Sequence, residues 1–172
     1  EKLIFGPDYN LGNYINSVTG RDMLLWNGGC HVHEKFSVEA IVKLKAEHPE
    51  AMVMAHLECK APVLAVADVK GSTATMLDYA KEHKETKEYI IATEAGILHE
   101  LQRCCPDVTF YPVPPEVSEG GVGCSCNECE YMKKNTLLKI YNTLRYELPE
   151  VTVDESIAKD AVKPIERMLE LS

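Results

Sequence analysis

The sequence predicts an α/β fold built from repeated three-layer α/β/α units with parallel sheets. One observation is that short continuous apolar runs alternate with helical patterns along the whole of the 172 residues. Continuous apolar runs are typical of parallel strands covered on both faces, and strand–helix alternation is the pattern of α/β proteins with right-handed crossovers. A second observation is that the order of the elements repeats within the chain.

The apolar runs and helical periodicities place each element. We expect strands at 2–6, 22–26, 51–56, 88–92 and 107–111, and helices near 8–18, 37–47, 61–67, 73–84, 94–104, 136–146 and 155–170. Ser37, Thr136 and Asp154 stand directly before or at the start of three of these helices. Their side-chain oxygens can accept a free backbone N–H of the first turn, so we expect all three to be N-caps.

The repeat becomes visible when segments are superposed. Residues 3–26 align without a gap on residues 89–112, with Asp8 on Glu94. Residues 30–50 then run alongside residues 129–150, with Cys30 on Cys129; the two copies differ mainly by an insertion before Cys129. A repeat of this length indicates duplicated α/β units rather than a short solenoid. Equivalent loops should meet at the carboxyl ends of the strands, where ligands bind in such folds.

Composition excludes several classes of function. The formal net charge of −9 argues against sequence-independent nucleic-acid binding, which needs a basic surface. The apolar fraction of 45% is ordinary for a globular protein. The sequence contains neither an apolar run of transmembrane length nor a signal peptide, so we expect no membrane contact and a cytoplasmic protein.

Seven cysteines in such a chain favour metal binding or redox chemistry over a disulfide framework. Cys124, Cys126 and Cys129 form a C-x-C-x-x-C pattern for which three uses stay open: a self-contained zinc knuckle, a reversible Cys126–Cys129 redox pair, or one ligand of a centre completed from far along the chain. Only Cys129 has a counterpart in the other copy of the repeat. Cys104 is expected to be a small buried hydrophobe, and Cys59 is a candidate ligand without a repeat partner.

Other candidates lie at predicted strand ends. His56 and Glu58 are two residues apart on a segment expected to be extended, which would point both side chains the same way for acid–base work or substrate binding. Ser72 and Thr73 open a predicted helix, where hydroxyls and free N–H groups can bind an anion. The loop 28–36 combines two glycines with Cys30, His31 and His33 and is typical of a functional loop.

Together these motifs resemble the quinolinate synthase family over essentially the whole chain. The resemblance runs from IFGPDYNLGNYI through GGCHVHEKF, HPEAMVMAHLEC and GSTATM to CNECEYMKKNTL and PIERMLEL. It implies three pseudo-symmetric α/β/α domains, each giving one cysteine to a [4Fe–4S] cluster. Residues 1–49 would be the later part of the second domain and residues 50–172 the third domain with its C-terminal helix.

The resemblance also implies roles for individual residues. Cys30 and Cys129 would be cluster ligands, Glu58 and His56 catalytic groups, and the substrate pocket would include His33, His56, Glu58, Ser72 and Thr73. The family is a transferase of NAD biosynthesis that condenses iminoaspartate with dihydroxyacetone phosphate, with an aspartate oxidase as upstream supplier. By this resemblance the first domain and its cysteine are missing from the chain and would precede Glu1, so we expect this chain alone to be inactive and to self-associate as a homodimer. The alternative is a metal- or redox-sensing module that uses the C-x-C-x-x-C insertion.

Overall fold

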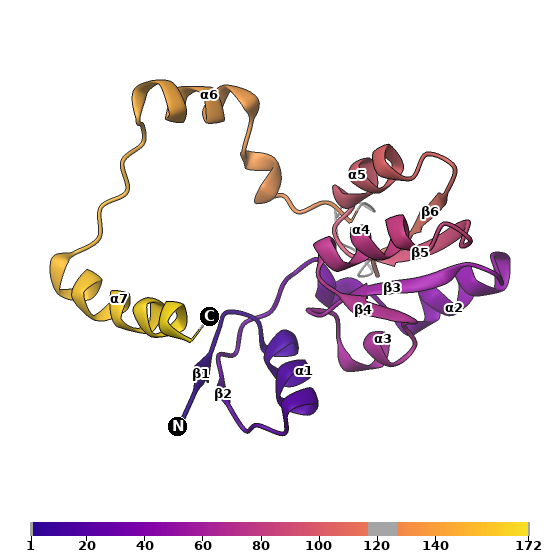
Figure 1. Cartoon of the computed structure of the whole chain (residues 1–172), viewed down its shortest axis with the longest axis horizontal. Coiled ribbons are helices and arrows are strands. Elements are labelled where there is room, and N and C mark those ends of the chain that lie inside the picture. Colours follow the sequence, from indigo (N-terminus) through magenta and orange to yellow (C-terminus); the bar gives the residue numbers. More distant parts are fainter. Residues whose placement is uncertain (1, 117–126, 172) are drawn as a thin grey trace. The chain divides into compact units, whose positions relative to one another are not determined.

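A computed structural model describes residues 2–116 and 127–171 (Figure 1). The chain divides into two compact units, residues 1–130 and 131–172, and each is described by itself. The first unit contains β1 (Ile4–Phe5), α1 (Tyr9–Thr19), β2 (Leu24–Leu25), the 3-10 helix η1 (His33–Lys35), α2 (Val38–Glu47), β3 (Met52–His56), α3 (Ala61–Ala65), β4 (Val69–Gly71), α4 (Thr73–Glu82), β5 (Glu88–Ala92), α5 (Ile97–Cys104) and β6 (Thr109–Pro112). The second contains the 3-10 helix η2 (Met132–Lys134), α6 (Leu137–Tyr146) and α7 (Glu155–Glu170). The division expected after residue 49 stays a prediction.

Four parallel strands form the main sheet, in the order β4-β3-β5-β6. The central strand β3 pairs Met54 with Val69 of β4 on one side and with Ile91 of β5 on the other. The chain therefore leaves β3 first to one side and then to the other, which makes the carboxyl ends of β3 and β5 a topological switch point. The parallel sheet with intervening helices confirms the predicted α/β class.

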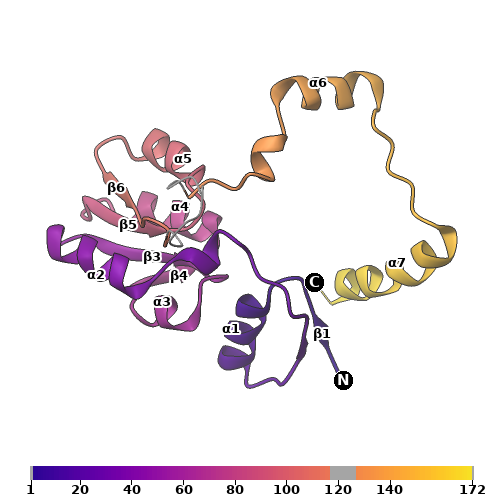
Figure 2. The ribbon, with the colours of Figure 1, turned by 180° about the vertical axis from the view of Figure 1, so that it is seen from behind.

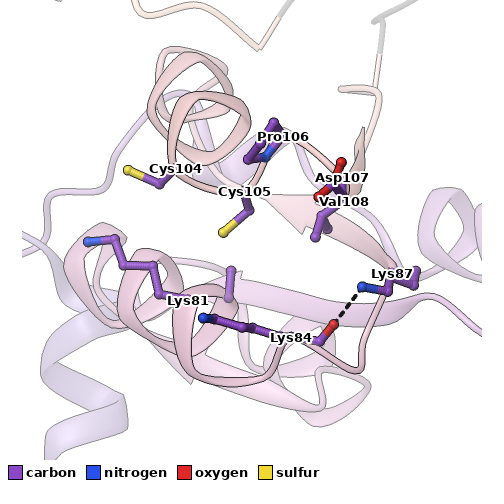
Figure 3. A pocket seen from close by; sticks show the side chains of 9 residues that line it. Lys81, Lys84, Lys87, Cys104, Cys105, Pro106, Asp107 and Val108 are labelled. Atoms are coloured by element: carbon purple, nitrogen blue, oxygen red, sulfur yellow. Dashed lines mark hydrogen bonds between the residues drawn. The ribbon is translucent and has the colours of Figure 1, made fainter.

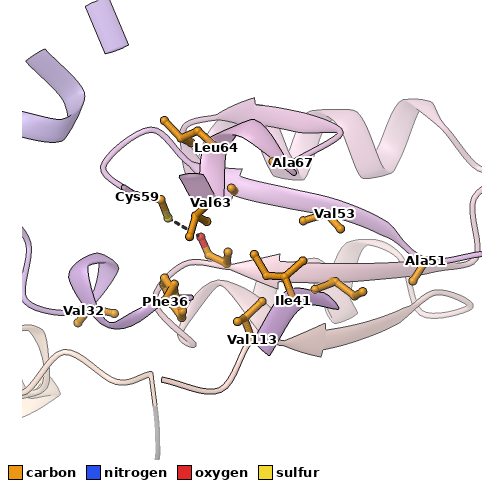
Figure 4. Close-up of a cluster of buried hydrophobic side chains, with 13 residues drawn as sticks. Val32, Phe36, Ile41, Ala51, Val53, Cys59, Val63, Leu64, Ala67 and Val113 are labelled. Atoms are coloured by element: carbon orange, nitrogen blue, oxygen red, sulfur yellow. Dashed lines mark hydrogen bonds between the residues drawn. The ribbon is translucent and has the colours of Figure 1, made fainter. Parts of the chain in front are cut away.

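Helices cover both faces of this sheet because successive side chains of a strand point to opposite faces. Figures 1 and 2 show α4 and α5 on one side and α2 and α3 on the other. The α2/α3 side buries the cluster in Figure 4, which includes Phe36, Ile41, Val53, Ala55, Val63, Ile90, Ala92 and Val113. The α4/α5 side buries Met54, Met76, Ala80, Tyr89, Ile91 and Leu101. The continuous apolar runs of β3 and β5 are thus buried on both faces, as the sequence predicts.

A smaller parallel sheet joins β1 to β2 through α1, with Ile4 opposite Leu24. Both strands are two residues long, shorter than the expected 2–6 and 22–26. Within the described residues only these two strands form this sheet, and the side chain of Ile4 is 80% exposed.

The helix starts confirm the predicted caps. The side chains of Ser37, Thr136 and Asp154 accept backbone N–H groups of Ala40, Lys139 and Ser156, respectively. The strand β4 was not predicted, since its three residues include a lysine and form no apolar run. Pairing with β3 defines it as a strand, which is a tertiary contact that local pattern does not report.

The two copies of the repeat share local structure. Cys30 is followed after two residues by η1, then the N-cap Ser37 and α2. Cys129 is followed in the same spacing by η2, then the N-cap Thr136 and α6. Within the described part of the chain, no helix is both long and apolar enough to cross a membrane.

Candidate functional site

The candidate site lies at the carboxyl edge of the main sheet. His56 ends β3, Thr93 follows β5, and Gly71 ends β4 opposite His56 in the strand register. The loop that carries Cys30 and His33 follows β2 and reaches this edge, since His33 hydrogen bonds to Thr93. Segments far apart in the sequence therefore meet where open α/β sheets bind ligands.

Cys30, His33 and Glu58 form the centre of the site. One ligand atom from each, a thiol sulfur, an imidazole nitrogen and a carboxylate oxygen, lies within 4.8 Å of the others. His33 Nδ1 is 3.1 Å from Glu58 Oε2. Although that distance is short, the buried Nδ1 atom has no hydrogen-bond partner of good angle among the described residues. A buried polar atom in this state is costly unless something else binds it.

His33 is held by contacts on both sides of its ring. Its Nε2 atom lies 3.0 Å from the hydroxyl of Thr93, which is itself buried. The ring of His56 stacks on it with the centroids 4.5 Å apart. Burial, with a smaller contribution from His56, lowers the pKa of His33 to about 4. His33 is therefore neutral at physiological pH, when one ring nitrogen donates and the other accepts.

His56 is fixed by the turn that follows its strand. The backbone N–H of Glu58 donates to His56 Nδ1 at 3.3 Å, so the ring proton sits on Nε2. Burial lowers the pKa of His56, and the charge of Glu58, whose Oε2 lies 3.9 Å from Nδ1, opposes that shift. The site therefore pairs two neutral imidazoles with one partly exposed carboxylate.

The expected geometry of segment 56–59 was wrong in one respect. His56 and Glu58 do lie close together, but the segment is not extended. Residues 57 and 58 form a turn, which is closed by a hydrogen bond from Cys59 N–H to His56 O. The turn sends Cys59 into the core, where its thiol is fully buried and donates to Ala92 O (Figure 4). Burial raises the pKa of Cys59 to about 12, which makes it a poor thiolate ligand.

Cys30 and Cys129 approach the same region. Both are partly buried and pack against the α2/α3 core cluster. Burial raises the pKa of the Cys30 thiol, and the negative charges of Glu58 and Cys129 raise it further. Cys129 therefore lies near enough to Cys30 to act electrostatically on its thiol. Cys124 and Cys126, and with them the redox pair and the zinc knuckle, lie outside the described residues.

Ser72 and Thr73 stand at the same edge as His56, but they are exposed. Ser72 is the N-cap of α4 and accepts the N–H of Thr75 at 3.2 Å. A Cβ on Gly71 would lie 2.6 Å from Thr75, so glycine allows α4 to start directly against β4. The N-cap Ser72 thus directly follows Gly71, which pairs with His56 in the sheet.

A separate cavity of about 470 Å³ lies at the other end of the sheet, before β5 and β6 (Figure 3). Lys81, Lys84 and Lys87 line it together with Cys104 and Cys105. Lys87 donates to the carbonyl of Lys84, and of the two neighbouring cysteines it is Cys105, not Cys104, that is buried. Cys104 is only partly buried and packs at the edge of the core. The prediction of a buried cysteine therefore holds for Cys105 and not for Cys104.

Sequence reasoning missed Thr93, which orients His33. Its only sequence signal is its place directly after the apolar strand β5. It also left Asp8 and Glu94 without a role, although they coincide in the repeat.

Comparison with known proteins shows the family of the chain. The family model described as Quinolinate synthetase A protein matches residues 1–170. Among curated relatives, the quinolinate synthase of Nostoc punctiforme is 48% identical over all 172 residues and that of Microcystis aeruginosa 47%. The quinolinate synthase of Chloroherpeton thalassium is also 47% identical. The chain covers 51–52% of these relatives, and so spans about half their length. The chain belongs to the quinolinate synthetase A family.

Proposed function

We propose that this chain is the part of a quinolinate synthase that supplies two cysteine ligands of a [4Fe–4S] cluster and one wall of the substrate pocket. The observation that carries the proposal is the convergence of Cys30, His33 and Glu58 within 4.8 Å at the switch point of the sheet. Family membership supports it, since the relatives are named quinolinate synthases. The whole reaction would be a transfer that condenses iminoaspartate with dihydroxyacetone phosphate and releases phosphate and two waters.

The residues present fit such a cluster. Cysteine thiolates are the usual ligands of iron–sulfur clusters and need not be close in sequence. Cys30 and Cys129 come from equivalent loops, and the charge of a Cys129 thiolate contributes to the raised pKa of Cys30. A cation centre would offset that charge and could bind the buried His33 Nδ1, which has no hydrogen-bond partner among the described residues. When bound, the cluster would supply Lewis acidity at an iron that no cysteine holds.

The chain's own residues would bind substrate and move protons. Glu58, 26% exposed at its side chain, is the group that can exchange a proton with a substrate carbon or hydroxyl. Neutral His33 and His56 would donate to or accept from substrate carboxylates and hydroxyls without adding charge. Ser72 and Thr73 would hold an anionic group at the N-terminus of α4. Burial of both imidazoles against the core keeps water from their inner faces.

Two thiols are too few for a cluster, so we propose that the 172-residue chain alone has no synthase activity. The third cysteine would come from a further domain. Cytoplasmic location, supply of iminoaspartate by an aspartate oxidase and a homodimer remain parts of this proposal.

Anaerobic reconstitution with iron and sulfide tests the proposal. Iron bound by the chain should fall sharply in Cys30→Ser and in Cys129→Ser, and stay unchanged in the matched control Cys104→Ser, which lies at the far end of the sheet. Quinolinate formation should be absent from the chain alone. Robust turnover would contradict the inactivity, and iron binding that depends on Cys124 and Cys126 but not on Cys30 would favour the sensing module.

A further inference from the structure

Two carboxylates occupy equivalent places in the two copies of the repeat, and neither belongs to the ligand set above. Asp8 lies between β1 and α1, and Glu94 lies between β5 and α5. Both are buried, with 4% and 9% of their surface exposed. A carboxylate buried at such a level is retained only when its oxygens are satisfied by donors.

Asp8 joins the start of a helix to the loop of Cys30. Its Oδ1 atom accepts the backbone N–H of Leu11 at 2.8 Å and caps α1. Its Oδ2 atom accepts the backbone N–H of Cys30 at 2.9 Å, from a residue 22 positions away. Each oxygen of this side chain therefore serves a different segment.

Glu94 makes the same two connections in the other copy. Its Oε2 atom accepts the N–H of Gly96 at 2.7 Å at the start of α5, and its Oε1 atom accepts the N–H of Cys129 at 3.1 Å. The neighbouring backbone contact is repeated as well. Tyr9 N–H donates to Gly28 O at 2.8 Å, and Ala95 N–H donates to Asn127 O at 3.0 Å.

We propose that Asp8 and Glu94 are positioning residues that fix the backbones of Cys30 and Cys129, so that both thiols point to one metal centre. Hydrogen bonds to a carboxylate are stronger than bonds between neutral groups, and two per side chain tie each cysteine loop to a rigid helix. Hydrogen bonds that orient the ligands of a metal commonly increase the affinity of the site for that metal. The inference rests on the proposed function, because it assumes that these cysteines bind metal.

The Glu94 carboxylate packs closely against Gly96. A Cβ at this position would lie 2.7 Å from Glu94 Oε2. Since that oxygen is the far end of a flexible side chain, Gly96→Ala would displace the carboxylate at small cost to the backbone. The substitution therefore moves Glu94 away from Cys129 without changing a charge or a ligand.

The experiment titrates the reduced 172-residue chain anaerobically with Co²⁺ and follows thiolate-to-cobalt charge-transfer absorption. Asp8→Asn and Glu94→Gln keep the shape of the side chain but leave only one acceptor oxygen for two N–H groups. We expect each to weaken Co²⁺ binding about 10- to 100-fold, the usual range for outer-shell changes. Gly96→Ala should reproduce the effect of Glu94→Gln.

Asp154→Asn is the matched control, because the Asp154 side chain also caps a helix, α7, but does so by accepting the N–H of Ser156 rather than that of a cysteine. Thermal unfolding of every apo variant separates positioning from stability. If Asp8→Asn and Glu94→Gln lose stability but bind Co²⁺ with the affinity and spectrum of the unmodified chain, the two residues are only structural and the inference is overturned.

The double variant Cys30→Ser/Cys129→Ser tests the proposed ligands separately. Its charge-transfer band should disappear. If the band survives in this variant, the ligand assignment fails and the positioning inference falls with it. If the band is lost there yet intact in the carboxylate variants, the ligand assignment stands and only the inference fails.

Discussion

Replacing Cys59 with alanine separates a core cysteine from the proposed metal ligands. The thiol is fully buried and bonded to Ala92 O, so its removal leaves a small cavity. Losing a methylene-sized group from the core costs about 0.8 kcal/mol in transfer free energy. A residual cavity of roughly 20 Å³ adds about 0.5 kcal/mol. We expect the free energy of unfolding to fall by about 1–1.5 kcal/mol on these grounds.

The same variant should leave metal binding intact. The pKa of Cys59 is about 12, against an ordinary value of 9.0, so its thiolate is about a thousandfold scarcer than that of an ordinary cysteine. Ionising it costs about 4 kcal/mol more, at about 1.4 kcal/mol for each pKa unit. Cys30, Cys104 and Cys129 are only partly buried, whereas Cys59 is fully buried.

Urea unfolding followed by circular dichroism measures the stability change, and Co²⁺ titration measures binding. Timed alkylation with mass spectrometry should find Cys59 the slowest of the described cysteines until the chain unfolds. The reasoning is refuted if Cys59→Ala removes the cobalt charge-transfer band, or if Cys59 is alkylated as fast as Cys104.

Three further predictions follow from the same structure. The pKa of His33 is lowered from 6.5 to about 4, so the unfolded chain binds more protons than the folded chain between these pH values. The free energy of unfolding should therefore be at its full value above pH 6.5 and should fall by at most about 3 kcal/mol on acidification to pH 4. Urea unfolding of His33→Gln at a series of pH values should show a flatter dependence. Phe36→Ala, at a fully buried ring, should cost about 3–5 kcal/mol in urea unfolding, whereas Ile4→Ala, at a side chain 80% exposed, should cost about 0.5 kcal/mol or less; equal losses would contradict the core assignment. Cys129→Ser should abolish the cobalt charge-transfer band and Cys124→Ser should not, and equal bleaching in both would reject the division between the repeat cysteine and the insertion.

The fold class was accessible from sequence because parallel strands and their helices leave local marks. The runs at β3 and β5 are apolar on both faces, and Ser37, Thr136 and Asp154 carry the oxygen that a helix start requires. Short elements have weaker sequence patterns. The strand β4 exists because β3 offers it backbone partners, and β1 and β2 are shorter than their apolar runs.

The sequence by itself determined which cysteines and histidines to consider, since the repeat singled out Cys30 and Cys129 and also aligned Asp8 with Glu94. Only the tertiary structure decided what these residues touch. It turned Cys59 into the core, brought Thr93 to His33 across 60 residues, and joined each repeat carboxylate to a cysteine N–H. The physical reason is that periodicity and capping depend on neighbours in the chain, whereas hydrogen bonds and burial at a sheet edge depend on which loops the topology brings together.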